Sequence, residues 1–219
     1  MGHLTHALKT RHDIRRHYSH LSGKGVAPTV GDEIKAIYAL RYLYSTPEVM
    51  CVYSAKSPVL CAYSDSAFAV HEQGTSSTAL ILCMSPTDAP FVCSAKAQSA
   101  VAPDIVAGEY YSAGSTCLLL SHFRQLAAQL GWIQGPTVVY MDSKSAINLA
   151  CAPAITKKAR HMKAKYYYIR QMVAAGEVSL VHIPAESMRV DMLSKIVSPS
   201  KFLTGRDSLM NLGAVGVSS

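Results

Sequence analysis

The stretch TVVYMDSKSAINLAC, residues 137–151, predicts a buried strand that runs directly into a helix, with an acidic residue at the junction. Residues 137–140 are rich in β-branched and aromatic side chains and follow a Gly-Pro turn signal. Asp142 then precedes two serines and a run with helical spacing, 143–151. A strand that leads at once into a helix is typical of α/β proteins, so this stretch predicts that class.

Strands and helices alternate on both sides of this unit. Early strands in succession, followed by strand–helix units, predict a mixed sheet with helices on its faces. Residues rich in β-formers predict strands at 49–53, 59–63, 78–84, 90–94 and 178–183. Three- and four-residue spacing of apolar side chains predicts helices at 31–47, 104–130, 156–175 and 186–196. The last 22 residues are rich in Ser and Gly, and we expect them to be peripheral.

Composition excludes several classes of protein. With 219 residues, 49% of them hydrophobic and 16% charged, the chain can bury a core, which excludes wholesale disorder. No apolar run reaches the ~18–20 residues that a membrane span needs. The first 20 residues are basic and His-rich, so we expect no secretory signal and a cytoplasmic or nuclear location. The six cysteines form no CxxC pair, and we expect them to be reduced thiols.

The charge balance favours an anionic partner. The chain has 21 Lys and Arg against 14 Asp and Glu, a net charge of +7. A basic surface attracts polyanions, of which nucleic acid is the commonest. A basic protein that is merely soluble is the alternative at this point.

Four acidic residues stand in apolar surroundings, where an unpaired carboxylate is costly. They are Asp65, Glu109, Asp142 and Asp191. If they converged, they would repel one another unless a cation neutralised them, and magnesium suits carboxylate oxygens and phosphate. Each also has a simpler interpretation. Asp142 could cap a helix, Asp191 could favour a helix dipole, and the other two could lie on a solvated face or in a loop.

Five motifs around these residues resemble the ribonuclease H domain at the C-terminal end of copia-type retrotransposon Pol polyproteins. They occur in the family's order and spacing over roughly residues 57–212, and are AYSDSAF, IVAGEYYSA, VYMDSKSAINLA, KKARHMKAKYYYIRQ and VHIPAESMRVDMLSK. Each motif is weak alone, whereas five in register are specific. Some positions depart from the family pattern: Ala67 and Phe68 replace an acid and a Trp, and Lys163 replaces another acid.

The resemblance implies a ribonuclease H-like α/β fold, with a five-stranded mixed sheet of order 3-2-1-4-5 and helices on both faces. It also implies a metal-dependent endonuclease that cleaves the RNA strand of RNA–DNA hybrids. Asp65, Glu109 and Asp142 would hold one magnesium ion (Mg2+), and Asp65 and Asp191 would hold a second. Manganese (Mn2+) would be a possible substitute. The rival function is an inactive module that binds hybrids or double-stranded RNA.

A basic segment without acidic residues is the predicted contact for the substrate, because a hybrid is held by its phosphates and its groove shape. The expected contacts there are Lys157, Lys158, Arg160, His161, Lys163 and Lys165. Ser66, Ser143 and Ser145 could donate to a phosphate or to a ribose hydroxyl. A solvated helix face is the alternative interpretation of the basic segment.

The resemblance also suggests a division of the chain into three parts. Residues 1–48 resemble the segment that joins reverse transcriptase to ribonuclease H, residues 49–197 form the ribonuclease H-like domain, and residues 198–219 form a tail. A reverse transcriptase domain in a longer Pol protein is therefore an expected partner, and a virus-like particle is an expected setting. No polymerase YxDD motif occurs, so DNA synthesis is not predicted.

Overall fold

A computed structural model describes residues 2–54, 58–71, 74–152 and 167–213. Its elements are α1 (Gly2–Ala7), η1 (His12–Ile14), α2 (Arg15–Gly23), α3 (Val30–Ser45), β1 (Cys61–Ala67), β2 (Ser77–Cys83), β3 (Val92–Ala97), α4 (Ile105–Gln129), β4 (Thr137–Met141), α5 (Lys144–Cys151), α6 (Tyr168–Ala174), β5 (Val178–His182), η4 (Ala185–Ser187), α7 (Asp191–Ser194) and α8 (Pro199–Met210).

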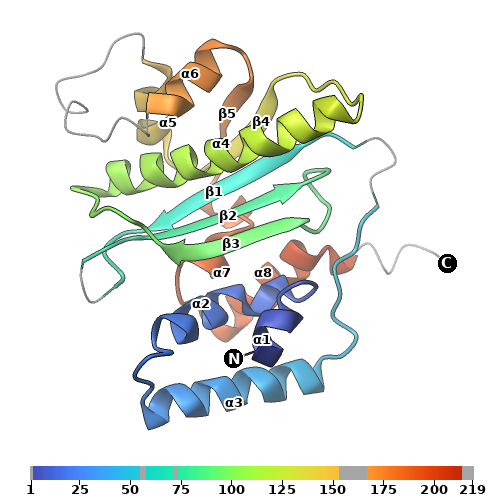
Figure 1. Cartoon of the computed structure of the whole chain (residues 1–219), viewed down its shortest axis with the longest axis vertical. Coiled ribbons are helices and arrows are strands. Elements are labelled where there is room, and N and C mark those ends of the chain that lie inside the picture. The colour runs from blue at the N-terminus through green and yellow to red at the C-terminus, as the bar shows by residue number, and fades with distance from the viewer. Residues whose placement is uncertain (1, 55–57, 72–73, 153–166, 214–219) are drawn as a thin grey trace.

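The five strands form one sheet in the order β3-β2-β1-β4-β5. The pairs β1–β2 and β2–β3 are antiparallel, whereas β1–β4 and β4–β5 are parallel. Three strands thus form a meander, and the last two are joined to the sheet by helical crossovers, as Figure 1 shows. This is the predicted mixed sheet with the predicted order, so the expected fold class is confirmed.

The period-two alternation of β1 divides the interior into two layers. Leu60 and Ala62 face α4, which crosses the sheet together with α5 and α6. Cys61 and Tyr63 face the opposite side, where α7 and the end of α8 cover the sheet. Both faces of β2 are fully buried, which explains its continuous apolar sequence. The helices on both faces agree with the expected α/β architecture.

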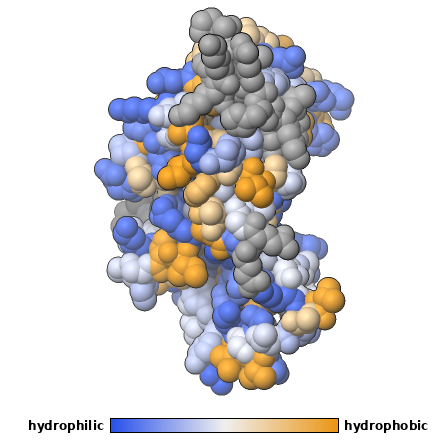
Figure 2. Space-filling view, turned by 90° about the vertical axis from the view of Figure 1, so that its left-hand side faces the viewer, coloured by the Kyte–Doolittle hydropathy of each residue, from blue (hydrophilic) through white to orange (hydrophobic). Residues whose placement is uncertain are grey.

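The N-terminal helices form a third layer beside β3 (Figure 1). Leu4, Leu8 and Leu21 pack with Ala39 of α3 in a small cluster of their own. At the junction with the sheet, a ring nitrogen of the buried His12 lies 3.0 Å from the carbonyl oxygen of Pro90. The N-terminal layer is therefore fastened to the sheet. Figure 2 shows that the lower end of the molecule, which this layer forms, carries both hydrophobic and hydrophilic side chains. Among the described residues, no helix combines the length and the apolar character that a bilayer crossing requires.

Most predicted elements are present, but three expectations are wrong. Residues 49–53 form no strand, although the Val52 amide and carbonyl bond Met210 and Ala89 at 3.0 and 3.1 Å. The helix predicted at 186–196 is split into η4 and α7 by a turn at 189–190. The C-terminal segment is not wholly peripheral, because α8 buries Leu209 and Met210 completely.

The helix predicted at 156–175 is described only in part. Its C-terminal portion is α6, which buries Ile169 and Met172 against α4. Residues 153–166, which contain the predicted basic contacts, lie outside the described residues. The division into residues 1–48, 49–197 and 198–219 stays a prediction.

Candidate active site

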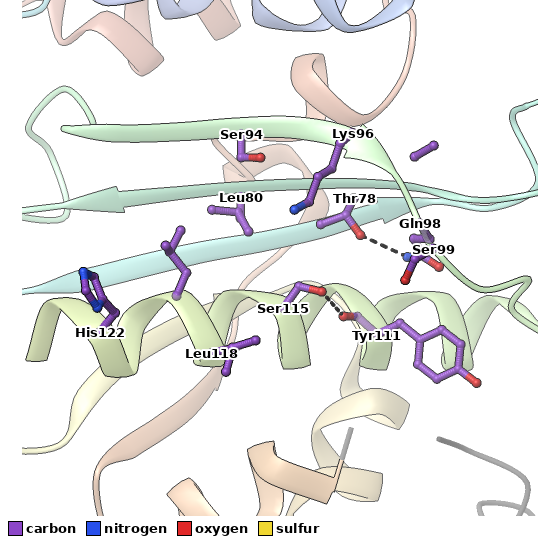
Figure 3. Close-up of a pocket in the computed structure, with 12 residues that line it drawn as sticks. Thr78, Leu80, Ser94, Lys96, Gln98, Ser99, Tyr111, Ser115, Leu118 and His122 are labelled. Carbon is purple, nitrogen blue, oxygen red and sulfur yellow. Dashed lines mark hydrogen bonds between the residues drawn. The ribbon is translucent and has the colours of Figure 1, made fainter. Parts of the chain in front are cut away.

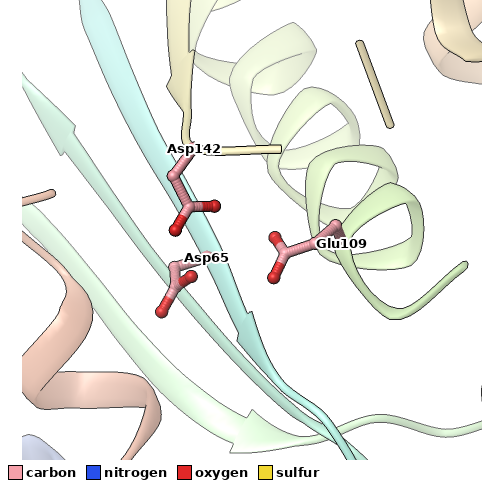
Figure 4. A group of neighbouring side chains, drawn as sticks. All are labelled: Asp65, Glu109 and Asp142. Carbon is pink, nitrogen blue, oxygen red and sulfur yellow. The ribbon is translucent and has the colours of Figure 1, made fainter. Parts of the chain in front are cut away.

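Three of the four predicted carboxylates meet at one end of the sheet. Asp65 lies on β1, Asp142 directly follows β4, and Glu109 projects from the second turn of α4 (Figure 4). Because β1 and β4 are parallel neighbours, their carboxyl ends lie at the same edge. One oxygen from each of the three residues lies within 4.8 Å of the others. The group is therefore compact enough for its members to share a cation.

Burial makes this group electrostatically expensive. Asp65 is 2% exposed and Glu109 is 5% exposed. Removal from water raises the pKa of Asp65 to about 6, and the charges of Asp142 and Asp191 add to the rise. Burial likewise raises the pKa of Glu109 to about 8, with repulsion from Asp65 and Asp142 as the next causes. At neutral pH, a positive charge among these carboxylates would reduce both the cost of their burial and their mutual repulsion.

Hydrogen bonds orient the group but leave part of it unsatisfied. The Ser66 backbone N–H and hydroxyl both donate to Glu109 Oε1, at 3.3 and 3.0 Å. The Ser112 hydroxyl donates to the backbone oxygen of Asp65 at 2.7 Å. In contrast, Asp65 Oδ2 and Glu109 Oε2 are buried without a hydrogen-bond partner. Two orphaned carboxylate oxygens in a cluster of three acids fit the ligand set of a hard divalent cation.

Asp191 lies nearby but outside the compact group. It begins α7, and its negative charge contributes to the raised pKa of Asp65. Its carboxylate forms an ion pair with Lys195, four residues later. Burial lowers the pKa of Lys195, but the hydrogen bond and charge of Asp191 outweigh burial, so the pKa is raised overall. The pair neutralises Asp191, and its i,i+4 spacing is a signal that the sequence contained and our prediction did not use.

The three serines that were predicted to contact the substrate differ in what they bind within the chain. Ser66 supports Glu109, as described above. Ser143 caps α5 by accepting a hydrogen bond from the Ala146 N–H, so the simpler interpretation of Asp142 as this cap is wrong. Ser145 is exposed on α5. Contacts of these serines with a substrate stay a prediction.

Gly108 provides a direct test of the support for Glu109. A Cβ at this position would lie 3.1 Å from the Ser66 hydroxyl oxygen and 3.6 Å from that of Ser76. We expect Gly108→Val to displace Ser66, weaken magnesium binding and lower the free energy of unfolding by about 1–3 kcal/mol. Urea unfolding and isothermal titration with magnesium would measure both effects. Gly31→Val on α3 is the matched control, because its nearest atom is 3.6 Å away. Equal effects of the two substitutions would contradict this account.

Together, the sheet topology and the carboxylate group define an α/β protein with the predicted ribonuclease H-like fold and a candidate metal site. No family model matches the chain. Its homologues are retrovirus-related Pol polyproteins of plant transposons. That of transposon TNT 1-94 from Nicotiana tabacum is 29% identical over 75% of this chain. Those of transposons RE2 and RE1 from Arabidopsis thaliana are each 28% identical over 92% of it. The predicted resemblance is thereby confirmed.

The chain spans only 12–14% of the length of these relatives. Among solved structures, LC11-RNase H1 isolated from compost is similar with a TM-score of 0.46 and 18% identity, over 62% of this chain and 92% of that one. RNase H1 from Halobacterium salinarum gives a TM-score of 0.40 and 17% identity, over 62% and 93%.

Proposed function

We propose that this chain cleaves the RNA strand of RNA–DNA hybrids in a reaction that depends on divalent metal, with magnesium as the native ion. The observation that carries the proposal is the compact group of the buried Asp65 and Glu109 and the half-buried Asp142, with two carboxylate oxygens that lack a partner. The homology to retrovirus-related Pol polyproteins supports the same function, because the motifs around these carboxylates resemble the ribonuclease H domain of such polyproteins.

The residues have distinct proposed roles. Asp65, Glu109 and Asp142 would hold one ion, and Asp65 together with Asp191 would hold a second. Bound metal would supply positive charge that activates water and stabilises the leaving oxygen of the phosphodiester. Ser66 would keep Glu109 in a fixed orientation through its two hydrogen bonds. Lys195 pairs with Asp191 and would have to release it when the second ion binds.

Substrate binding would depend on the net positive charge of the chain and on the basic residues at 157–165. Ser143 and Ser145 lie beside Asp142 at the start of α5 and would contact the backbone of the hybrid. A reverse transcriptase domain in a longer Pol protein would add affinity, with residues 1–48 as its connection. An inactive module that binds hybrids is the second candidate, favoured by the departures at Ala67 and Phe68.

The test is cleavage of a uniformly labelled RNA–DNA hybrid in magnesium or manganese, beside the same RNA in duplex and single-stranded form. We expect internal cuts in the hybrid only. Asp142→Asn should lower the cleavage rate at least about 100-fold, because a metal ligand is lost. Asp104→Asn is the matched control, since Asp104 caps α4 outside the group and asparagine caps equally well.

Two results would count against catalysis. Hybrid binding without cleavage, unchanged by Asp142→Asn, would select the binding module. Cleavage that survives Asp142→Asn at the original rate would show that the carboxylate group is not the catalytic site.

A further inference from the structure

A pocket whose lining includes none of the three carboxylates lies between α4 and the strands β2 and β3 (Figure 3). Its volume is about 490 Å³, within the ~300–1,000 Å³ range of small-molecule sites. Thr78 and Leu80 contribute from β2, Ser94 and Lys96 from β3, and Ser115 and His122 from α4. In Figure 3 the side chain of Lys96 extends from β3 over β2, in the direction of α4.

The lining of this pocket is suited to an anion. None of the residues that line it carries a carboxylate, whereas Lys96 supplies an ammonium group and His122 an imidazole. Hydroxyl groups of Thr78, Ser94 and Ser115 lie in the same lining. An ammonium group with neighbouring hydroxyls is a common setting for a phosphate group. Leu80 and Leu118 add apolar side chains to the lining. Leu118 is 62% exposed, so its apolar side chain is largely open to solvent.

Gln98 provides an independent indication of a ligand. The residue is only 8% exposed, and its Nε2 donates to the Gly108 carbonyl at 2.9 Å and to Thr78 Oγ1 at 3.2 Å. Because a carbonyl can only accept, these bonds fix which end of the amide is the nitrogen. The other end, Oε1, is buried without a partner. A buried acceptor without a donor is costly, so a ligand that supplies an N–H or O–H would be favoured.

We propose that this pocket binds a nucleotide. The phosphate would lie at Lys96 and Ser94, and an amino group of the base or a ribose hydroxyl would donate to Gln98 Oε1. A phosphate at Lys96 does not by itself satisfy Gln98, which requires a donor elsewhere on the ligand. The nucleotide is either free or one unit of a nucleic-acid strand, since both present the same groups.

The pocket is linked to the carboxylate group by short contacts. Gln98 holds the carbonyl of Gly108, the residue before Glu109. Thr78, which accepts from Gln98, is paired in the sheet with Ser66, the donor to Glu109. A ligand in the pocket could therefore change the orientation of Glu109 through these contacts. The binding itself does not require the proposed catalysis.

The experiment is a titration of isotope-labelled whole chain, in chelator, with a ribonucleoside 5′-monophosphate, inorganic phosphate and a short single-stranded RNA. Chelator removes any metal at the carboxylates, so binding there is not measured. We expect the monophosphate or the RNA to shift amide signals of β3 and of the middle of α4. Lys96→Met should weaken this binding about tenfold, and Ser94→Ala should weaken it less. Lys201→Met, an exposed lysine of α8, is the matched control and should bind as the wild type does.

The probes distinguish the sources of the ligand. RNA that binds at least tenfold more tightly than the monophosphate would assign the pocket to a strand, and the reverse order would assign it to a free nucleotide. Inorganic phosphate that binds as tightly as both would overturn the proposal, as would binding unaffected by Lys96→Met. The cleavage assay separates this outcome from the proposed function. A wild-type chain that cleaves hybrids but binds no probe in the pocket would contradict the pocket alone, and one that binds a probe in the pocket but does not cleave would contradict catalysis alone.

Discussion

Replacing Arg189 with alanine should lower the free energy of unfolding by about 3–5 kcal/mol, among the largest effects expected for one substitution in this chain. The guanidinium is buried and donates to four backbone carbonyl oxygens. These belong to Pro86 at 2.8 Å, Asp88 at 2.9 Å, Ser208 at 2.6 Å and Leu209 at 3.3 Å. Without these donors, several buried acceptors would lose their hydrogen bonds.

The position of Arg189 explains why the effect should reach the candidate active site. The residue lies in the turn between η4 and α7, two residues before Asp191. It fastens this turn to the β2–β3 connection and to the end of α8, and its guanidinium lies 5.5 Å from the centre of the Tyr63 ring. Release of the turn would free Asp191 to move relative to Asp65. We therefore expect weaker magnesium binding as well as lower stability.

Urea unfolding followed by circular dichroism would measure the loss of stability. Arg189→Lys keeps the charge but not the planar set of donors. Its free energy of unfolding should therefore lie between those of the wild type and Arg189→Ala, and it should remain folded for metal titration. Arg41→Ala on the exposed face of α3 is the matched control and should change stability by less than about 0.5 kcal/mol. A change below 1 kcal/mol for Arg189→Ala would contradict the proposed role.

The carboxylate group could be predicted because each of its members lies at a junction that local sequence signals mark. Asp142 follows a strand and precedes a helix, and Asp65 lies in a strand of small and polar residues after an apolar run. Their convergence depended on the resemblance, since spacing alone also allowed a cap or a loop. Ser66 was predicted as a substrate contact and not as a support of Glu109, and Ser194 was missed, because both act through tertiary contacts that no local pattern marks.

The three wrong elements have a common physical cause. Local preference was overridden by contacts with distant parts of the chain. Residues 49–53 are β-formers, but the backbone of Val52 bonds Met210 at the end of α8 and Ala89 instead of a neighbouring strand. The helix at 186–196 is interrupted where Arg189 turns inward toward four carbonyls. Most residues of α8 are polar, which favoured a peripheral segment, yet Leu209 and Met210 at its end are fully buried.

The metal-free protein should lose stability as the pH rises from about 4 to 8. Asp65 and Glu109 have ordinary pKa values of 3.8 and 4.5, and burial raises them to about 6 and about 8 in the folded chain. Because the folded state binds these protons more tightly, their contribution to stability is fully present below the unfolded values. It is lost as the pH passes through the folded values. Each shift corresponds to about 3–5 kcal/mol, and the two are not additive because part of each is mutual repulsion.

Glu109→Gln removes one of these charges while keeping the size of the side chain. In chelator at pH 8.5, we expect the variant to melt several degrees above the wild type, since 1 kcal/mol corresponds to about 2–4 °C for a chain of this size. The difference should vanish near pH 4, where both carboxyls are protonated in the wild type. Thermal unfolding across this pH range would measure the effect. Glu33→Gln is the matched control, because Glu33 is an exposed glutamate of α3.

Magnesium should reverse the order of the melting temperatures of the wild type and Glu109→Gln. A cation among the carboxylates removes the penalty of the wild type and adds its own binding free energy, whereas Glu109→Gln has lost a ligand. We therefore expect magnesium at pH 8.5 to raise the melting temperature of the wild type above that of the variant. If Glu109→Gln were less stable than the wild type in chelator, repulsion would not dominate the group. If magnesium stabilised both proteins equally, Glu109 would not hold the metal, and the same carboxylates could then be structural acids of a binding module.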